Sequence, residues 1–187
     1  MNSKFGIEDL SIEGVKLITP FYAEDSRGHF LKSIERDVYK SWGLDADIFE
    51  EFETASQAGV IRGMHFQFDD PQTKIVRVIN GRINDVILDL RKESPTFGKY
   101  IVVELSGENH KIVWIPAGCA HGFEVLSEEG AVMSYTCVGK YIYEKDTGIY
   151  YADPDLDIRW SIKDPLVSEK DKNLMSFQTF IDEHGSL

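Results

Sequence analysis

The chain has 187 residues, of which 20 are Lys or Arg and 32 are Asp or Glu, so its formal net charge is −12 at pH 7. This negative charge disfavours binding to nucleic acids, because it repels phosphate polymers. The hydrophobic share of 42% and the aromatic share of 12% exclude a disordered chain. At this length we expect residues 1–187 to form a single domain.

Two features indicate a cytoplasmic protein. The first residues, MNSKFGIEDL, lack the cationic start and apolar block of a secretion signal. The longest apolar runs, of about six residues, are far shorter than the roughly 20 needed to cross a bilayer. Cys119 and Cys137 lie in apolar segments, and two thiols cannot form a disulfide framework, so we expect both to be buried and reduced.

Short apolar runs separated by turn residues dominate the sequence, which is typical of an antiparallel barrel or sandwich. The candidate strands are residues 14–19, 29–33, 48–55, 60–67, 74–79, 82–90, 100–105, 110–115, 121–126 and 131–137. Helix is predicted for residues 36–42 and for one or two segments within 168–181, where Ser168 is a suitable N-cap. The sequence therefore predicts an all-β fold with short peripheral helices.

Asn80-Gly81 lies between two candidate strands and predicts a hairpin with a type I′ turn, because both residues tolerate positive φ. Alternation along the flanking strands assigns to shared faces Lys74, Val76 and Val78, and then Ile83, Asp85, Ile87 and Asp89. These charged side chains either line a partly polar barrel interior or face solvent. Alternation alone does not decide between the two.

The segment Arg62-Gly63-Met64-His65-Phe66-Gln67 closes one candidate strand. Arg62 and His65 differ by three positions, so strict alternation places them on opposite faces. A bulge at Gly63 would shift the register by one residue and bring both to one face. Taken alone, His65 is better explained as a structural histidine of a strand than as a catalytic residue.

A second motif, Pro116-Ala117-Gly118-Cys119-Ala120-His121, follows a candidate strand and fits the pattern P-x-G-x-x-H. Pro and Gly favour a tight turn, after which His121 enters the next strand. The pattern is characteristic of cupin barrels, in which this His is often a metal ligand. Here the matching H-x-H pair is replaced by His65-Phe66-Gln67, so His65 and His121 do not complete a set of three or more ligands. We therefore expect no metal.

With the further titratable residues Lys74, Asp85, Tyr135 and Asp171, the sequence resembles the dTDP-4-dehydrorhamnose 3,5-epimerase family. The resemblance extends from about Gly14 to Lys172, and the matching segments are 25–30, 61–67, 74–77, 89–98, 114–123, 148–154 and 168–171. It implies a cupin-type jelly roll that works without metal or other cofactor. It also implies a homodimer that epimerises a nucleotide-linked 4-keto-6-deoxy sugar at C3, or at C3 and C5.

The resemblance also implies roles for individual residues. His65 matches the general base, Asp171 its carboxylate partner, Lys74 the cation beside the keto oxygen, and Tyr135 the acid on the opposite face. Arg27 and Arg62 match residues that hold the diphosphate. Phe30 matches a residue that packs near the base of the nucleotide. Asp85, His121 and Tyr141 match other pocket residues. In the family the N-terminal strands cross between subunits, so Arg27 and Phe30 are expected to serve the neighbouring site.

These residue types suit proton transfer next to a ketone. A fixed positive charge stabilises the enolate that forms when the proton leaves. An imidazole titrates near neutral pH and can take that proton, and a carboxylate on its other nitrogen raises its basicity. A phenol on the opposite face can return a proton and thereby invert the carbon.

The sequence departs from the family pattern around the ligand. Lys32 replaces a usual Glu, Glu50-Glu51-Phe52 replaces a polar Q-D-N run, and residues 138–143 lack the usual T-D-Y-Y-x-P. The loop at 128–130 is one residue longer, and if the strand absorbs that residue, Ser134 rather than Tyr135 points inward. We expect retained catalysis on a different nucleotide or hexose.

Three alternatives remain. A 3,4-ketoisomerase on the same barrel shares the His-dependent enolisation but moves the carbonyl. A non-catalytic sugar-nucleotide binder would need no His–Asp pair. A metal-dependent cupin oxygenase would contain bound metal.

Overall fold

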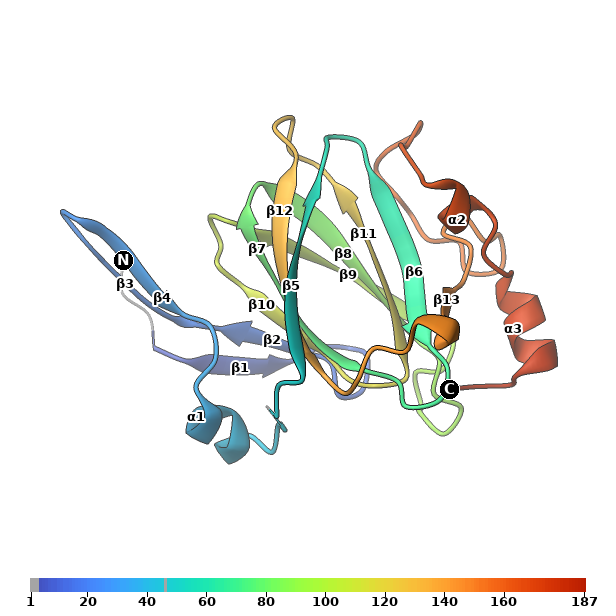
Figure 1. Cartoon of the computed structure of the whole chain (residues 1–187), viewed down its shortest axis with the longest axis horizontal. Helices are drawn as coiled ribbons and strands as arrows, with labels where there is room; N and C mark the ends of the chain where they lie inside the picture. Colours follow the sequence, from blue (N-terminus) through green and yellow to red (C-terminus); the bar gives the residue numbers. More distant parts are fainter. Residues whose placement is uncertain (1–3, 46) are drawn as a thin grey trace.

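The computed structural model describes residues 4–45 and 47–187. Two antiparallel sheets face each other and form the main body (Figure 1). The first sheet has the order β1 (Gly6–Asp9), β2 (Lys16–Thr19), β10 (Ile112–Ile115), β7 (Thr73–Asn80), β12 (Ala131–Val138), β5 (Glu50–Ser56). The second has the order β13 (Asp146–Gly148), β6 (Ile61–Gln67), β11 (Cys119–Val125), β8 (Arg82–Asp89), β9 (Tyr100–Ser106). The predicted all-β jelly roll is confirmed.

A separate hairpin of β3 (Phe21–Asp25) and β4 (Gly28–Lys32) extends away from the two sheets (Figure 1). Every predicted strand is present within a few residues of its expected bounds. The sequence did not indicate β1, β3 or β13. β1 and β13 are short and rich in Gly and Asp, which are poor strand formers, and they are ordered by pairing with β2 and β6.

The predicted helices are also present, as α1 (Arg36–Ser41), α2 (Glu169–Lys172) and α3 (Phe177–Glu183), with a 3-10 turn η1 (Tyr143–Lys145). The Ser168 hydroxyl accepts a hydrogen bond of 3.0 Å from the Asp171 amide, which confirms the predicted N-cap. Within the described residues, no helix has the length and apolar character that a membrane span requires.

Three hydrophobic clusters hold these layers together. The largest fills the space between the sheets and includes Val76, Ile87 and Phe123. A second packs α3, through Phe180, against the outer face of the second sheet. A third packs the α1 segment, through Tyr39, against Trp114 on the outer face of the first sheet. Because β11 is covered on both faces, its whole length is buried, including His121 and Glu124.

The predicted hairpin at Asn80-Gly81 is wrong. β7 pairs with β10 and β12 in the first sheet, whereas β8 pairs with β9 and β11 in the second, so the chain crosses between sheets at this point. Asn80 still belongs to β7, and Gly81 has φ of 82°. A Cβ atom at Gly81 would lie 2.2 Å from the Gly130 oxygen. The glycine is therefore required by a close crossing of chains and not by a type I′ turn.

The structure places Lys74, Asp85 and Asp89 on the inner side of β7 and β8. Val76, Val78, Ile83 and Ile87 belong to the cluster between the sheets, and Asp85, which alternates with them, is fully buried. Lys74 shares the inward face of β7. Asp89 is also buried, but it accepts bonds from Arg91, Ser94 and Thr96 and anchors the loop after β8. Cys119 and Cys137 are both free and buried.

The predicted bulge at Gly63 is confirmed. His65 on β6 lies opposite His121 on β11, but Arg62 lies opposite Phe123, so two β6 residues face the single residue Gly122. Gly63 has φ of 120°, and a Cβ atom there would lie 2.5 Å from the Gly122 Cα atom. This close backbone contact requires glycine, and it turns Arg62 and His65 toward the same side.

Gly63→Ala is expected to destabilise the chain by about 3 kcal/mol, because the new methyl group collides with backbone that cannot move away. Gly28→Ala is the matched control, since Gly28 has nearly the same φ, 122°, but nothing within 4 Å of its Cβ position. Urea unfolding measures both. Equal losses in the two variants would show that backbone conformation, and not the contact with Gly122, decides the cost.

Candidate active site

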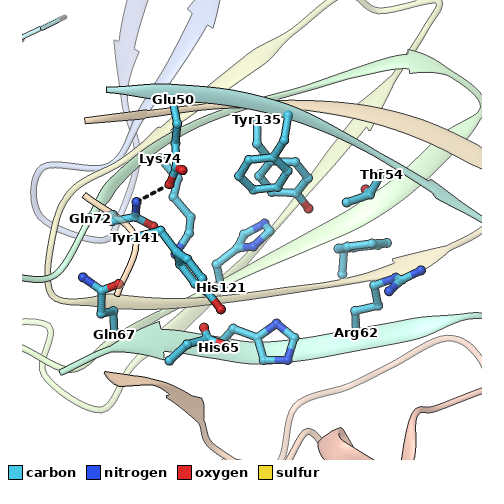
Figure 2. Close-up of a pocket in the computed structure, with 13 residues that line it drawn as sticks. Glu50, Thr54, Arg62, His65, Gln67, Gln72, Lys74, His121, Tyr135 and Tyr141 are labelled. Atoms are coloured by element: carbon cyan, nitrogen blue, oxygen red, sulfur yellow. Dashed lines mark hydrogen bonds between the residues drawn. The ribbon is translucent and has the colours of Figure 1, made fainter. Parts of the chain in front are cut away.

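A cavity of about 400 Å³ opens between the two sheets. The first sheet contributes side chains from β5, β7 and β12, and the second contributes side chains from β6, β11 and β13. Figure 2 shows the cavity with its labelled residues converging from both sides. The lining residues are Glu50, Phe52, Thr54, Arg62, His65, Gln67, Gln72, Lys74, His121, Phe123, Tyr135, Tyr141 and Asp146.

Strand register explains how the first sheet presents its polar groups. Residues directly opposite one another on neighbouring strands point to the same face. One such row across β5, β12 and β7 is Glu50, Cys137 and Lys74. The next row inward is Phe52, Tyr135 and Val76, so Tyr135 points into the cavity. Ser134 points to the outer face, toward Glu51, which excludes the alternative in which it replaces Tyr135.

His65 lies on the opposite wall and is oriented by a carboxylate. Its Nε2 atom is 2.8 Å from Oδ1 of Asp171, a residue of α2. Burial raises the pKa of Asp171, but its bonds to His65, to the Gly63 amide and to Ser168 outweigh this effect and leave that pKa below its usual value. The imidazole remains 31% exposed, so one edge is free to meet a ligand.

A second His–carboxylate pair lies deeper. His121 Nε2 is 2.5 Å from Oδ1 of Asp85, and both side chains are buried. The other oxygen of Asp85 has no hydrogen-bond partner within the described residues, and burial raises the pKa of this carboxyl group. His121 lines the cavity, whereas Asp85 supports it from behind.

Burial acts in opposite directions on the two other proton-carrying groups of the first sheet. It lowers the pKa of Lys74, because the charged ammonium is less stable away from water. It raises the pKa of Tyr135 well above its usual value, and the charge of Asp85 adds to that increase. Tyr135 is thus a phenol that keeps its proton. Its ring stacks on Phe52 at 4.9 Å and 8° and meets His121 edge-on at 5.7 Å.

Arg62 and Tyr141 lie in the cavity wall as well. The Arg62 Nε atom donates to the Ser56 hydroxyl at 3.0 Å. Tyr141 lies on the segment after β12, and Gln67 holds this segment with two hydrogen bonds. The Gln67 side-chain amide donates to the Lys140 carbonyl at 3.0 Å and accepts from the Ile142 amide at 2.7 Å. Gln67 therefore positions Tyr141 without any covalent constraint.

Arg27 and Phe30 do not reach this cavity. Both lie on the β3–β4 hairpin, where Arg27 pairs with Asp25 at 2.6 Å and Phe30 is 57% exposed. Tyr22 in the same hairpin stacks on His110 at 4.3 Å. Of the residues predicted from the sequence, the structure therefore gathers His65, Lys74, Tyr135, Asp171, Arg62, Asp85, His121 and Tyr141, and leaves these two on a projecting arm.

Several lining residues were not predicted as site residues. Gln67 is two positions after His65 on one strand, so alternation could have identified it. Gln72, Thr54 and Asp146 gave no such signal, because their placement depends on which strands pair. Among the described residues, no group of three or more His, Cys, Asp or Glu side chains has the arrangement of a metal site.

Comparison with known proteins agrees with this geometry. Residues 9–179 match the family model described as dTDP-4-dehydrorhamnose 3,5-epimerase. The enzyme of that name from Methanothermobacter thermautotrophicus is 41% identical over 174 residues, which cover 91% of this chain and 94% of the relative. The chain belongs to the dTDP-4-dehydrorhamnose 3,5-epimerase family. It is thereby an isomerase, as the sequence predicted.

Solved structures of epimerases share the fold of this family member. A dTDP-6-deoxy-D-glucose-3,5-epimerase from Legionella pneumophila, in complex with dTDP-4-keto-L-rhamnose, has a TM-score of 0.88 and 38% identity, and the match covers 92% of this chain and 93% of that one. A 4-keto-6-deoxy sugar epimerase from the novobiocin cluster of Streptomyces spheroides has a TM-score of 0.92 and 31% identity, with coverage of 97% and 92%.

Asp171→Asn is expected to reduce the free energy of unfolding by about 2 kcal/mol at neutral pH, because charge-assisted bonds to His65 and Gly63 are lost. The lowered pKa of Asp171 means that its contribution is present above about pH 4 and lost as the pH falls through that pKa. The difference between wild type and variant should therefore shrink in acid.

Urea unfolding at several pH values measures this difference. Asp157→Asn is a control, because Asp157 is 84% exposed and its ion pair with Arg159 is 4.0 Å long. A wild-type advantage that stays constant down to about pH 3 would contradict a stabilising ionised Asp171.

Proposed function

We propose that this chain epimerises a nucleoside-diphosphate-linked 4-keto-6-deoxy sugar at C3, or at C3 and C5, by removing a proton on one face and returning one on the other. The observation that carries the proposal is the opposition of two proton-carrying groups across one cavity. His65 extends from the second sheet and Tyr135 from the first, and both line the same space (Figure 2).

In this mechanism His65 is the base. The bond of 2.8 Å to Asp171 occupies Nε2, so Nδ1 is the nitrogen left to take the proton from the carbon next to the ketone. The carboxylate orients the ring and stabilises the imidazolium that forms. Its lowered pKa keeps Asp171 ionised throughout.

Lys74 stabilises the enolate. Loss of the carbon-bound proton moves negative charge onto the C4 oxygen, and an ammonium fixed at that oxygen lowers the barrier most when little water surrounds it. Lys74 points into the cavity from the sheet that also holds Tyr135. The C4 oxygen is therefore expected to lie against the first sheet, with C3 between His65 and Tyr135.

Tyr135 is the acid. Its raised pKa keeps the phenol protonated at neutral pH, so it can donate to the enolate carbon from the face opposite His65. Delivery to that face inverts the configuration. Arg62 and Tyr141 are assigned to the diphosphate and the sugar, because both line the cavity that also holds His65, Lys74 and Tyr135.

The nucleotide or hexose is proposed to differ from that of the rhamnose precursor. The polar Q-D-N run of the family is replaced by Glu50-Glu51-Phe52, of which Glu50 and Phe52 line the cavity. Phe52 presents an aromatic face, partly covered by Tyr135, where the family offers a carboxamide. These changes alter ligand contacts and leave the His–Asp pair, Lys74 and Tyr135 in place.

Arg27 and Phe30 are proposed to act in a homodimer, in the cavity of the partner subunit. The hairpin that carries them extends away from its own sheets (Figure 1), and their side chains are exposed. Arg27 would then supply a cation to the diphosphate. An exposed Phe30 would be covered by the bound nucleotide.

Two substitutions separate the proposed acid from the proposed base. Each variant is incubated in deuterium oxide with 4-keto-6-deoxy sugars linked to thymidine, uridine or guanosine diphosphate. His65→Asn should lose deuterium incorporation at C3 by at least about 100-fold while still binding the sugar nucleotide. Tyr135→Phe should retain incorporation, because His65 still removes the proton, but lose net inversion by a similar factor. NMR of the sugar measures both quantities.

No incorporation by wild type with any of these sugars would refute the epimerase and favour a non-catalytic binder. Incorporation accompanied by a shift of the carbonyl from C4 to C3 would identify a 3,4-ketoisomerase. Incorporation lost on metal removal would favour the metal-dependent alternative.

The shared site is tested by complementation. Arg27→Ala and His65→Asn subunits should each be inactive alone, and mixing them with subunit exchange should restore about a quarter of wild-type activity, because half the dimers then contain one intact site out of two. Equal mixtures that remain inactive, although subunit exchange is demonstrated by mass spectrometry, would place Arg27 outside the partner's site.

A further inference from the structure

Lys74 lies in a cross-strand row with one carboxylate and one thiol. Glu50 on β5 is directly opposite Cys137 on β12, which is directly opposite Lys74 on β7. All three therefore point to the cavity face, and each step across the row spans about 5 Å between Cβ atoms. Figure 2 shows Glu50 and Lys74 on the same side of the cavity.

Glu50 is held in place by Gln72, which is itself anchored to the backbone. The Gln72 amide donates to its Oε1 atom at 2.7 Å and also donates to the Gly139 carbonyl at 2.9 Å (Figure 2). Within the described part of the chain, no cationic nitrogen lies within 4.0 Å of the Glu50 carboxylate. Glu50 is thus a carboxylate that is oriented by Gln72 and is not neutralised by a direct ion pair within the described residues.

The charged and titratable groups around Lys74 come from five other strands and from the segment after β12. Burial lowers the pKa of Lys74, while Cys137, Asp146, Glu50 and Cys119 oppose this shift. Burial raises the pKa of Cys137 to about 11 and that of Cys119 to about 12, so both thiols are neutral near pH 7. The other titratable groups of the cavity wall are His65, Arg62, His121, Tyr135 and Tyr141.

Because both thiols are neutral, only the carboxylates of Glu50 and Asp146 can oppose the lowering of the Lys74 pKa by burial. Asp146 on β13 pairs with Lys170 Nζ at 2.5 Å, and this cation offsets part of its field at Lys74. Glu50 has no such cation. In the family this position is usually an uncharged Gln, so the row in this chain contains a negative charge that the family pattern lacks.

We propose that Glu50 is a positioning residue that keeps the ammonium group of Lys74 charged inside the cavity. This inference rests on the proposed function for its importance, since an uncharged amine could not stabilise an enolate. The placement of the charge itself depends only on the strand register and on the bond from Gln72. Glu50 acts through Lys74 and touches no reacting atom.

Titration of Lys74 by NMR, with lysine labelled at ¹³Cε, tests the proposal without turnover. Glu50→Gln keeps the shape and can still accept the bond from Gln72, but removes the charge. The Lys74 signal should titrate at lower pH in this variant than in wild type. Glu51→Gln is the matched control, because Glu51 is adjacent in sequence but lies on the outer, exposed face of β5. It should leave the titration unchanged.

Glu50→Asp separates charge from packing. The shorter side chain weakens the bond to Gln72 but keeps an anion in the row, so Lys74 should titrate close to wild type. A Glu50→Gln titration that matches Glu51→Gln, or a Glu50→Asp titration shifted as far as Glu50→Gln, would overturn the proposal. Unchanged signals of the remaining lysines would verify that each variant is folded.

The same variants change the rate in a defined pH range if the proposed function holds. The ratio of the deuterium incorporation rate at pH 7 to that at pH 10 should be about tenfold larger in Glu50→Gln than in wild type, the effect of one unit charge about 10 Å away. Glu51→Gln should keep the wild-type ratio. A shifted NMR titration without any incorporation in wild type would refute the epimerase but leave the role of Glu50 intact, whereas unshifted NMR with active enzyme would refute only that role.

Discussion

The hydrogen bond between His65 on β6 and Asp171 on α2 links the wall of the barrel to the C-terminal part of the chain. The other carboxylate oxygen accepts from the amide of Gly63, so the bulged strand and the helix are joined at two points. This contact depends on the backbone packing of Gly63 against Gly122, which turns His65 inward. Orientation of the imidazole, the bulge and the position of α2 are therefore one coupled arrangement.

The two sheets present different side chains to opposite sides of the cavity. The second sheet contributes the imidazole of His65, while the first contributes the phenol of Tyr135 and the ammonium of Lys74. Burial favours the neutral form of both Tyr135 and Lys74, so it raises the pKa of the phenol and lowers the pKa of the ammonium group. A neutral phenol is what a proton donor requires, whereas an ammonium must be supported by nearby anions.

The need of Lys74 for nearby anions bears on two positions at which this sequence departs from the family pattern. Glu50 stands where the pattern that the sequence resembles has Gln and adds an anion to the row that ends in Lys74, and Phe52 covers one face of Tyr135. Both changes lie on β5, at the edge of the first sheet, where substitution does not disturb the core. Ligand contacts can therefore change while the His65–Asp171 bond and the opposing Tyr135 persist.

The sequence by itself determined the all-β class, nearly all strand positions, the Ser168 cap and the residues of the epimerase motifs, because alternation, turn residues and capping are local properties. It did not determine which strands pair. Asn80-Gly81 suggested a hairpin, yet the strands on either side belong to different sheets. Only tertiary structure decided that Tyr135 and not Ser134 faces the cavity, that Glu50 shares a row with Lys74, and that Arg27 and Phe30 lie on a projecting arm. Each of these depends on contacts between residues distant in sequence, which local patterns do not encode.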